Sequence, residues 1–159
     1  MASEPTPRLR KASNRDREEV IGLVYGVLRE YNVDPDPDAT DADLKDIEQS
    51  YFARGGTFFV LEDQGGSIIG TYGLYRLENH TCELRKMYLD ESRRGEGLGR
   101  FLLDSSLAEA RRLGFTRVTL ETASILKEAI ALYESYGFVE YETDHLSPRC
   151  DQAYVLELH

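Results

Sequence analysis

Residues 81–103 read TCELRKMYLDESRRGEGLGRFLL and join a predicted strand to a predicted helix through a glycine-rich loop. Glycines at positions 95, 97 and 99 allow tight turns and expose successive backbone N–H groups. The helix that follows adds the partial positive charge of its N-terminus, which favours a bound phosphate. Arg94 and Arg100 are predicted to add charge-assisted donors.

Two familiar phosphate loops do not match these residues. A Walker A loop ends in GK[ST], whereas this loop ends in Gly99-Arg100-Phe101. A dinucleotide fingerprint needs GxGxxG, and its third glycine is replaced here by Arg100 or Leu102. On the loop alone, a glycine-rich connection without a ligand stays open as a second interpretation.

The region before the loop predicts two helices. A strand is expected at 9–12, and Ser13 with Asp16 forms a capping box that starts a helix extending to about Tyr31. A second capping box, Thr40 with Asp43, predicts a helix that ends near Phe52.

The loop between these helices carries five aspartates. They either attract a cationic acceptor or are simply solvated, and both interpretations stay open. Their positions are 34, 36, 38, 41 and 43.

The remaining segments alternate strands with helices. GTFFVLED and SIIGTYGLY form a predicted hairpin, and Asn79-His80 forms a turn into the strand at 81–89. Further strands are expected in RVTLET, FVEYE and AYVLEL, and helices at about 98–113 and 125–136. The pattern predicts a mixed α/β (α+β) domain over residues 7–159 after a flexible leader at 1–6.

Composition narrows the function classes. The net charge of −10 argues against nucleic acid as a partner and fits either a cationic substrate or a need for solubility. Cys82 and Cys150 lie in no CxxC or Cys/His cluster, which predicts free thiols, no metal and a reducing, cytoplasmic location. No apolar run is long enough to cross a membrane.

The motif R-x-x-G-x-G at Arg94, Gly97 and Gly99 resembles the GNAT superfamily of N-acetyltransferases. CELRKMYLDES resembles its central strand, and ETASILKEAIALYESYGF resembles its helix with the LY…GF signature. The resemblance covers about 8–158. It implies a mostly antiparallel sheet of about seven strands, splayed in the middle, with about four helices.

The resemblance also implies a coenzyme A site, with acetyl-CoA as co-substrate. The pantetheine arm would pair with strand Thr81–Leu89 through the backbone of Met87 and Leu89. Backbone amides of the loop would take the pyrophosphate. The loop residues given this role are Arg94, Gly95, Glu96, Gly97, Leu98, Gly99 and Arg100.

Two residues match the family's catalytic positions. Glu83 lies four residues before Met87, on the same strand face by simple alternation, and would deprotonate the amine through water or with a raised pKa. Tyr133 would protonate the departing thiolate. The alternatives are a Glu83–Arg85 ion pair and a Tyr133 that only packs.

One position departs from the family pattern, and the histidines and Cys150 give little indication of a catalytic role. Leu126 stands where many relatives carry an asparagine that orients the cofactor. His80, His145 and His159 show no catalytic or metal spacing, and an acyl-Cys150 intermediate is not needed for direct transfer. The resemblance places acceptor recognition in Tyr31–Phe52 and about Tyr141–Tyr154.

Together these features predict direct acetyl transfer from acetyl-CoA to a primary amine in a ternary complex. The acceptor would be a small molecule or a protein or peptide amine, and the chain a monomer or homodimer. The alternatives are a non-catalytic acyl-CoA sensor of the same fold and a protein that binds ATP or NAD. Nucleic acid, membrane and metal are not expected partners.

Overall fold

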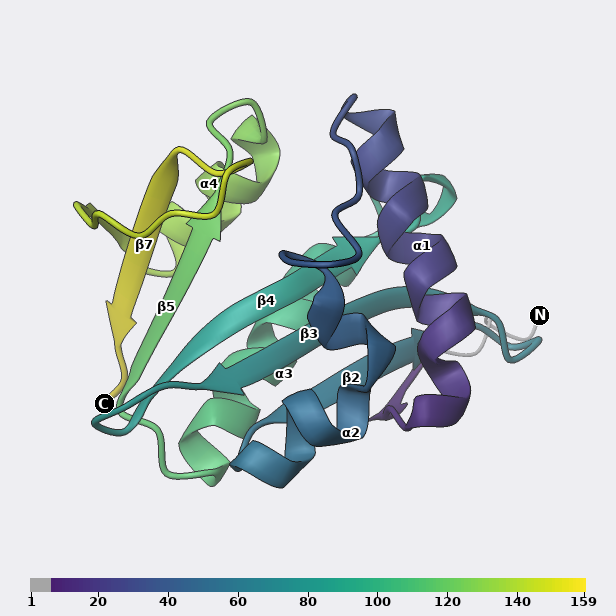
Figure 1. Ribbon diagram of the computed structural model, residues 1–159, viewed down its shortest axis with the longest axis horizontal. Coiled ribbons are helices and arrows are strands. Elements are labelled where there is room, and N and C mark those ends of the chain that lie inside the picture. The colour runs from purple at the N-terminus through teal and green to yellow at the C-terminus, as the bar shows by residue number, and fades with distance from the viewer. Residues whose placement is uncertain (1–6) are drawn as a thin grey trace.

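A computed structural model describes residues 7–159, and the predicted leader at 1–6 lies outside the described residues (Figure 1). Seven strands form one sheet in the order β1-β2-β3-β4-β5-β7-β6, in which only the β4–β5 pair is parallel. The strands are β1 Arg8–Lys11, β2 Thr57–Glu62, β3 Ile68–Arg76, β4 Thr81–Leu89, β5 Arg117–Thr122, β6 Val139–Tyr141 and β7 Gln152–Glu157.

Four α-helices cover the sheet: α1 Arg17–Glu30, α2 Ile47–Ser50, α3 Leu98–Arg112 and α4 Lys127–Ser135. Figure 1 shows α1 and α2 in front of strands β2–β4 and α3 behind them. Two apolar clusters follow this layering, one around α1 and α2 and one around α3. The predicted mixed α/β fold, with about seven strands and four helices, is confirmed. Within residues 7–159, no helix is long and apolar enough to cross a membrane.

The sheet is splayed between β4 and β5, as predicted. Their pairing is limited to three positions, Thr81–Glu83 against Arg117–Thr119. Beyond Glu83, β4 stays paired with β3 while β5 turns toward β7 (Figure 1). The side of β4 that faces β5 therefore lacks a partner strand from Leu84 onward.

A β-bulge at Lys86 interrupts β4. Gly73 pairs with Arg85 but Thr71 pairs with Tyr88, so Lys86 and Met87 together oppose one residue of β3. Lys86 adopts a φ of 54°, a left-handed conformation that is uncommon for a residue other than glycine. The extra residue reverses the alternation of side chains in the second half of the strand.

The two predicted capping boxes have different outcomes. The first is present: Ser13 and Asp16 cap each other reciprocally, and α1 follows after one 3₁₀ turn. The second is wrong, because the Thr40 hydroxyl donates to Asp36 over 3.0 Å rather than capping a helix. Asp46 caps α2 instead, and α2 is a single turn between two 3₁₀ segments.

Candidate active site

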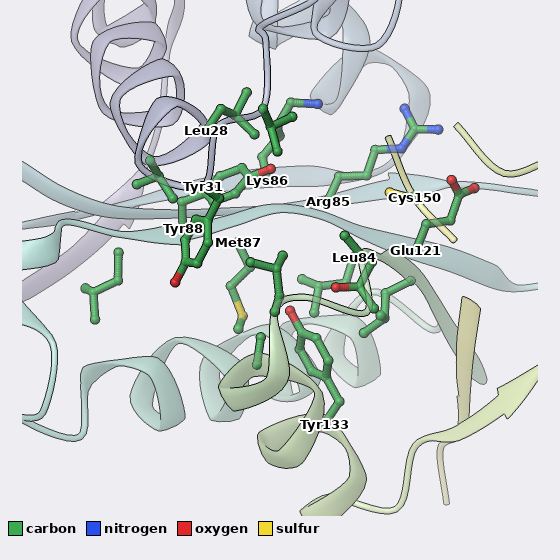
Figure 2. A pocket seen from close by; sticks show the side chains of 18 of the residues that line it. Leu28, Tyr31, Leu84, Arg85, Lys86, Met87, Tyr88, Glu121, Tyr133 and Cys150 are labelled. Atoms are coloured by element: carbon green, nitrogen blue, oxygen red, sulfur yellow. The ribbon is translucent and has the colours of Figure 1, made fainter. Parts of the chain in front are cut away.

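A cavity of about 690 Å³ opens where β4 and β5 separate. Residues from both faces of the sheet line it, because the missing strand contacts leave a passage between the α1 side and the α3–α4 side. Figure 2 shows side chains from α1, β4, β5 and α4 around this space. An elongated ligand can therefore extend from one face of the sheet to the other.

The glycine-rich loop forms one end of the cavity. Gly95 and Gly97 have φ angles of 84° and 80°, and a Cβ added at either would meet nothing within 4 Å. Helix α3 begins at Leu98, so its first backbone N–H groups point to the same end. The space over the loop and the direction of these donors fit a phosphate group.

The side chains of Arg94, which lines the cavity, and of Arg100 have partners within the protein. The Arg94 guanidinium is paired with Glu30 of α1 and donates to the Leu89 carbonyl over 3.0 Å. Arg100 lies over the ring of Tyr136, with 5.3 Å from its guanidinium carbon to the ring centroid. Both arginines would have to leave these partners to reach a phosphate, so the loop's backbone is the better candidate.

The other predicted cofactor residues divide into two groups. Gly99 and Leu98 line the cavity, as do Met87 and Leu89, whose side chains also pack against the α3 cluster. Glu96 instead forms an ion pair with Arg93 over 2.9 Å outside the cavity lining.

Glu83 lies in the lining at the last residue of the β4–β5 pairing. It is 8% exposed and forms an ion pair with Arg85, so the predicted alternative is present as well. Burial raises the pKa of Glu83 against the opposing effect of Arg85, and the charge of nearby Glu121 adds to the rise. A carboxyl with a raised pKa is a better proton acceptor for an amine than an ordinary glutamate.

Glu83 and Met87 do not share a strand face, so that prediction is wrong. Leu84 and Met87 contact the α3 cluster, whereas Tyr88 packs against the α1 cluster. The bulge at Lys86 is the cause. Across it, side chains three positions apart, such as those of Leu84 and Met87, point to the same side of the sheet, whereas in a regular strand residues two or four apart do so. Glu83 consequently reaches the cavity from the α1 side.

Tyr133 enters from the opposite side, on α4. Its ring packs edge-on against Phe138, with centroids 5.8 Å apart, and its hydroxyl points toward β4 (Figure 2). No group among residues 7–159 forms a hydrogen bond with this hydroxyl. Burial raises the pKa of Tyr133 above its usual range, and Tyr88 adds to this, so the phenol stays protonated at neutral pH.

The acidic loop is not simply solvated, and its buried part was not foreseen. Asp41 has a fully buried side chain that accepts two hydrogen bonds from Arg149, at 2.6 and 2.8 Å. Lys86 lies 3.4 Å from Asp41 and 3.1 Å from Asp43, and donates to the Thr40 carbonyl. These ion pairs join the loop, β4 and the segment before β7 on the α1 side of the cavity.

Sequence reasoning also missed two residues of the cavity lining, of which Glu121 lies near Glu83. Glu121 on β5 accepts a hydrogen bond from the Ser147 backbone over 2.8 Å, and His145 lines the same cavity. Strand alternation could have placed Glu121, since it follows Thr119, the partner of Glu83, by two residues. Burial raises the pKa of the Cys150 thiol, which makes it a poor nucleophile.

Comparisons with known proteins identify the family of the chain. The model of the acetyltransferase (GNAT) family matches residues 22–138. The uncharacterised N-acetyltransferase YjgM of Escherichia coli K12 is 37% identical over 138 residues, which are 84% of this chain and 82% of that protein. Human N-acetyltransferase 8B is 30% identical over 105 residues, covering 63% of this chain and 46% of that protein.

Solved structures show the same fold. A GNAT-family acetyltransferase from Staphylococcus aureus Mu50 superimposes with a TM-score of 0.90 at 25% identity, over 97% of this chain and all of that one. YncA of Salmonella typhimurium, solved with its cofactor acetyl-CoA, has a TM-score of 0.75 at 22% identity, over 98% and 95% of the two chains. The family model spans most of the chain and a 37% identical relative spans most of its length; this chain belongs to the GNAT family of N-acetyltransferases.

Proposed function

We propose that the chain transfers an acetyl group from acetyl-CoA directly to a primary amine in a ternary complex. The observation that carries the proposal is the opposed placement of Glu83 and Tyr133. They enter one cavity from the two faces of the sheet, at the point where β4 and β5 separate. A base and an acid so placed suit a transfer between two substrates that arrive from different sides.

The loop and the unpaired side of β4 fit acetyl-CoA, which would supply the acetyl group as a thioester. Backbone N–H groups from Gly95 to Gly99 would hold its pyrophosphate, and the backbone beyond Leu84 would pair with its amide-bearing arm. Glu83 would take the proton of the acceptor ammonium, directly or through water. The freed amine would attack the thioester carbonyl, so that the C–N bond forms as the C–S bond breaks, and the nitrogen would lose a second proton to solvent. The Tyr133 hydroxyl would give its proton to the leaving sulfur and regain one from solvent.

Thiol release from acetyl-CoA across a library of amines tests the proposal. Turnover with at least one amine is expected. Calorimetric binding of acetyl-CoA without any thiol release would instead favour the acyl-CoA sensor. Binding of ATP or NAD in preference to acetyl-CoA would favour a nucleotide-binding protein.

Substitution of Gly97 tests the phosphate loop. Gly97→Val is expected to weaken acetyl-CoA binding about tenfold or more, because the side chain would fill the space over the backbone donors. Gly114→Val is the matched control, since Gly114 has a φ of 90° and equally open surroundings but lies outside the cavity. Calorimetry measures both; equal affinities for acetyl-CoA would refute the loop assignment.

The pH dependence of kcat/KM tests the role of Glu83 as base, through substitution of its neighbour Glu121. Glu121→Gln removes a negative charge that raises the pKa of Glu83, so this pKa should fall and the carboxylate should stay ionised to lower pH. The acid limb of kcat/KM should move to lower pH, while Glu109→Gln on α3 should leave it in place. An acid limb that stays unchanged in Glu121→Gln would contradict the role of Glu83 as base.

A further inference from the structure

Two arginines contact the same tyrosine beside Glu83. The guanidinium carbon of Arg85 lies 3.7 Å from the ring centroid of Tyr75, and that of Arg54 lies 4.2 Å from it. Tyr75 is the register partner of Glu83 across β3 and β4. The cationic groups therefore lie next to the proposed base rather than at the phosphate loop.

Arg85 keeps most of its donors unused. Only its Nε donates to Glu83, and no acceptor among residues 7–159 contacts its two terminal nitrogens. Its side chain is 32% exposed and lines the cavity. Figure 2 shows the guanidinium extending from β4 on the side away from Tyr133, in the region of Glu121 and Cys150. Paired terminal N–H groups of this kind bind a carboxylate in a bidentate manner.

Arg54 brings a second guanidinium group to this place. Arg54 has no carboxylate partner within residues 7–159, where its contacts are the Tyr75 hydroxyl and the Arg76 carbonyl. Glu83 pairs with Arg85 alone, and the charges of Asp43 and Glu121 also act on this pair.

The other cations on this side of the cavity are already neutralised. Lys86 and Arg149 are held by Asp41 and Asp43, and the Asp36 side chain accepts from Thr40. The same pairs engage Asp41 and Asp43, two of the five aspartates that could have attracted a purely cationic acceptor. Arg85 is left as the cation that an acceptor in the cavity can reach.

Resting on the acetyl transfer proposed above, we propose that the acceptor is a small amine with its own carboxylate, of the amino-acid type. Its carboxylate binds the terminal nitrogens of Arg85 and its amine lies at Glu83. Because Arg85 and Glu83 contact each other, the two charged groups of the acceptor are only a few bonds apart. An α- or β-amino acid meets this requirement, and a simple alkylamine does not.

The test compares matched acceptors: amino acids of varied side chain, their primary amides, and the corresponding amines without the carboxylate. Each amino acid forms a series with its own amide and amine. In the series with the fastest thiol release, kcat/KM should be about tenfold or more higher for the amino acid than for its two analogues, because the analogues leave the Arg85 guanidinium unpaired. Equal or better turnover of the amides and plain amines would overturn the acceptor class while leaving amine acetylation intact. Acetyl-CoA binding without turnover of any acceptor would overturn the proposed function itself.

Variants assign the carboxylate contact to Arg85. Arg85→Gln should reduce the preference for the amino acid over its amide about tenfold or more, because the charged fork is lost. This preference is the ratio of kcat/KM for the amino acid to kcat/KM for its amide, both measured on the same variant. An effect of the substitution on Glu83 changes both values equally and cancels in the ratio. Arg76→Gln, an exposed arginine next to Tyr75 that does not line the cavity, should keep the wild-type ratio. An unchanged ratio in Arg85→Gln would remove Arg85 from the carboxylate site.

Discussion

Replacing Tyr133 by phenylalanine is expected to lower kcat about 10²- to 10⁴-fold, the usual contribution of a positioned acid or base. The hydroxyl points into the cavity and forms no hydrogen bond with residues 7–159, so its removal leaves no buried partner unpaired. Acetyl-CoA affinity and the free energy of unfolding should therefore stay near wild-type values. Steady-state kinetics, calorimetry and denaturant unfolding measure the three quantities.

Tyr136→Phe provides the control for this variant. Tyr136 lies at the end of the same helix, but its hydroxyl donates to Asp104 over 2.5 Å outside the cavity lining. Its kcat should remain close to that of the unmodified chain. If Tyr133→Phe also keeps its kcat, the tyrosine only packs, and the thiolate leaves without its help.

Asp41→Ala is expected to destabilise the chain by about 3–5 kcal/mol, the cost of breaking a buried ion pair on one side. The substitution removes the carboxylate that faces both Arg149 and Lys86, and Lys86 is 5% exposed. Burial alone would raise the pKa of Asp41, but the hydrogen bonds from Arg149 and the Asp36 backbone hold it below its usual value. The loss should appear as a lower denaturant midpoint.

Asp38→Ala is the matched control on the same loop. Asp38 is 90% exposed and pairs with Lys45 at the surface, where an ion pair contributes little. Its unfolding midpoint should hardly change. Equal midpoints for the two variants would show that the Asp41 pairs do not stabilise the fold.

Segments governed by local patterns were predicted well. The RVTLET strand spans the same residues, 117–122, in the structure, and the Asn79-His80 turn has φ angles of 57° and 58° that suit a two-residue hairpin loop. Ser13 and Asp16 act within one turn of each other, so their capping box is a local property. Such features depend on residues close together in the chain.

Features that depend on distant contacts were not predictable in the same way. Asp41 and Arg149 are 108 positions apart, and no local pattern distinguishes Asp41 from the other aspartates of its loop. The Thr40 box failed because Asp36 competes for its hydroxyl. Arg94 fits the motif, but its partner Glu30 comes from α1, which only the tertiary fold brings to the loop.

The bulge at Lys86 also determines how β4 would respond to a change in its length. Deleting that single residue would restore regular alternation between Arg85 and Met87. Both halves of the strand would keep their faces after this deletion, because Leu84 and Met87 already lie on the α3 side. If Lys86 instead stayed and took a regular strand conformation while the second half kept its place in the core, Glu83 and Arg85 would turn toward the α3 leucines and Leu84 toward α1. The bulge therefore accommodates Lys86 and keeps the charged pair on the α1 side and the apolar side chains in the core.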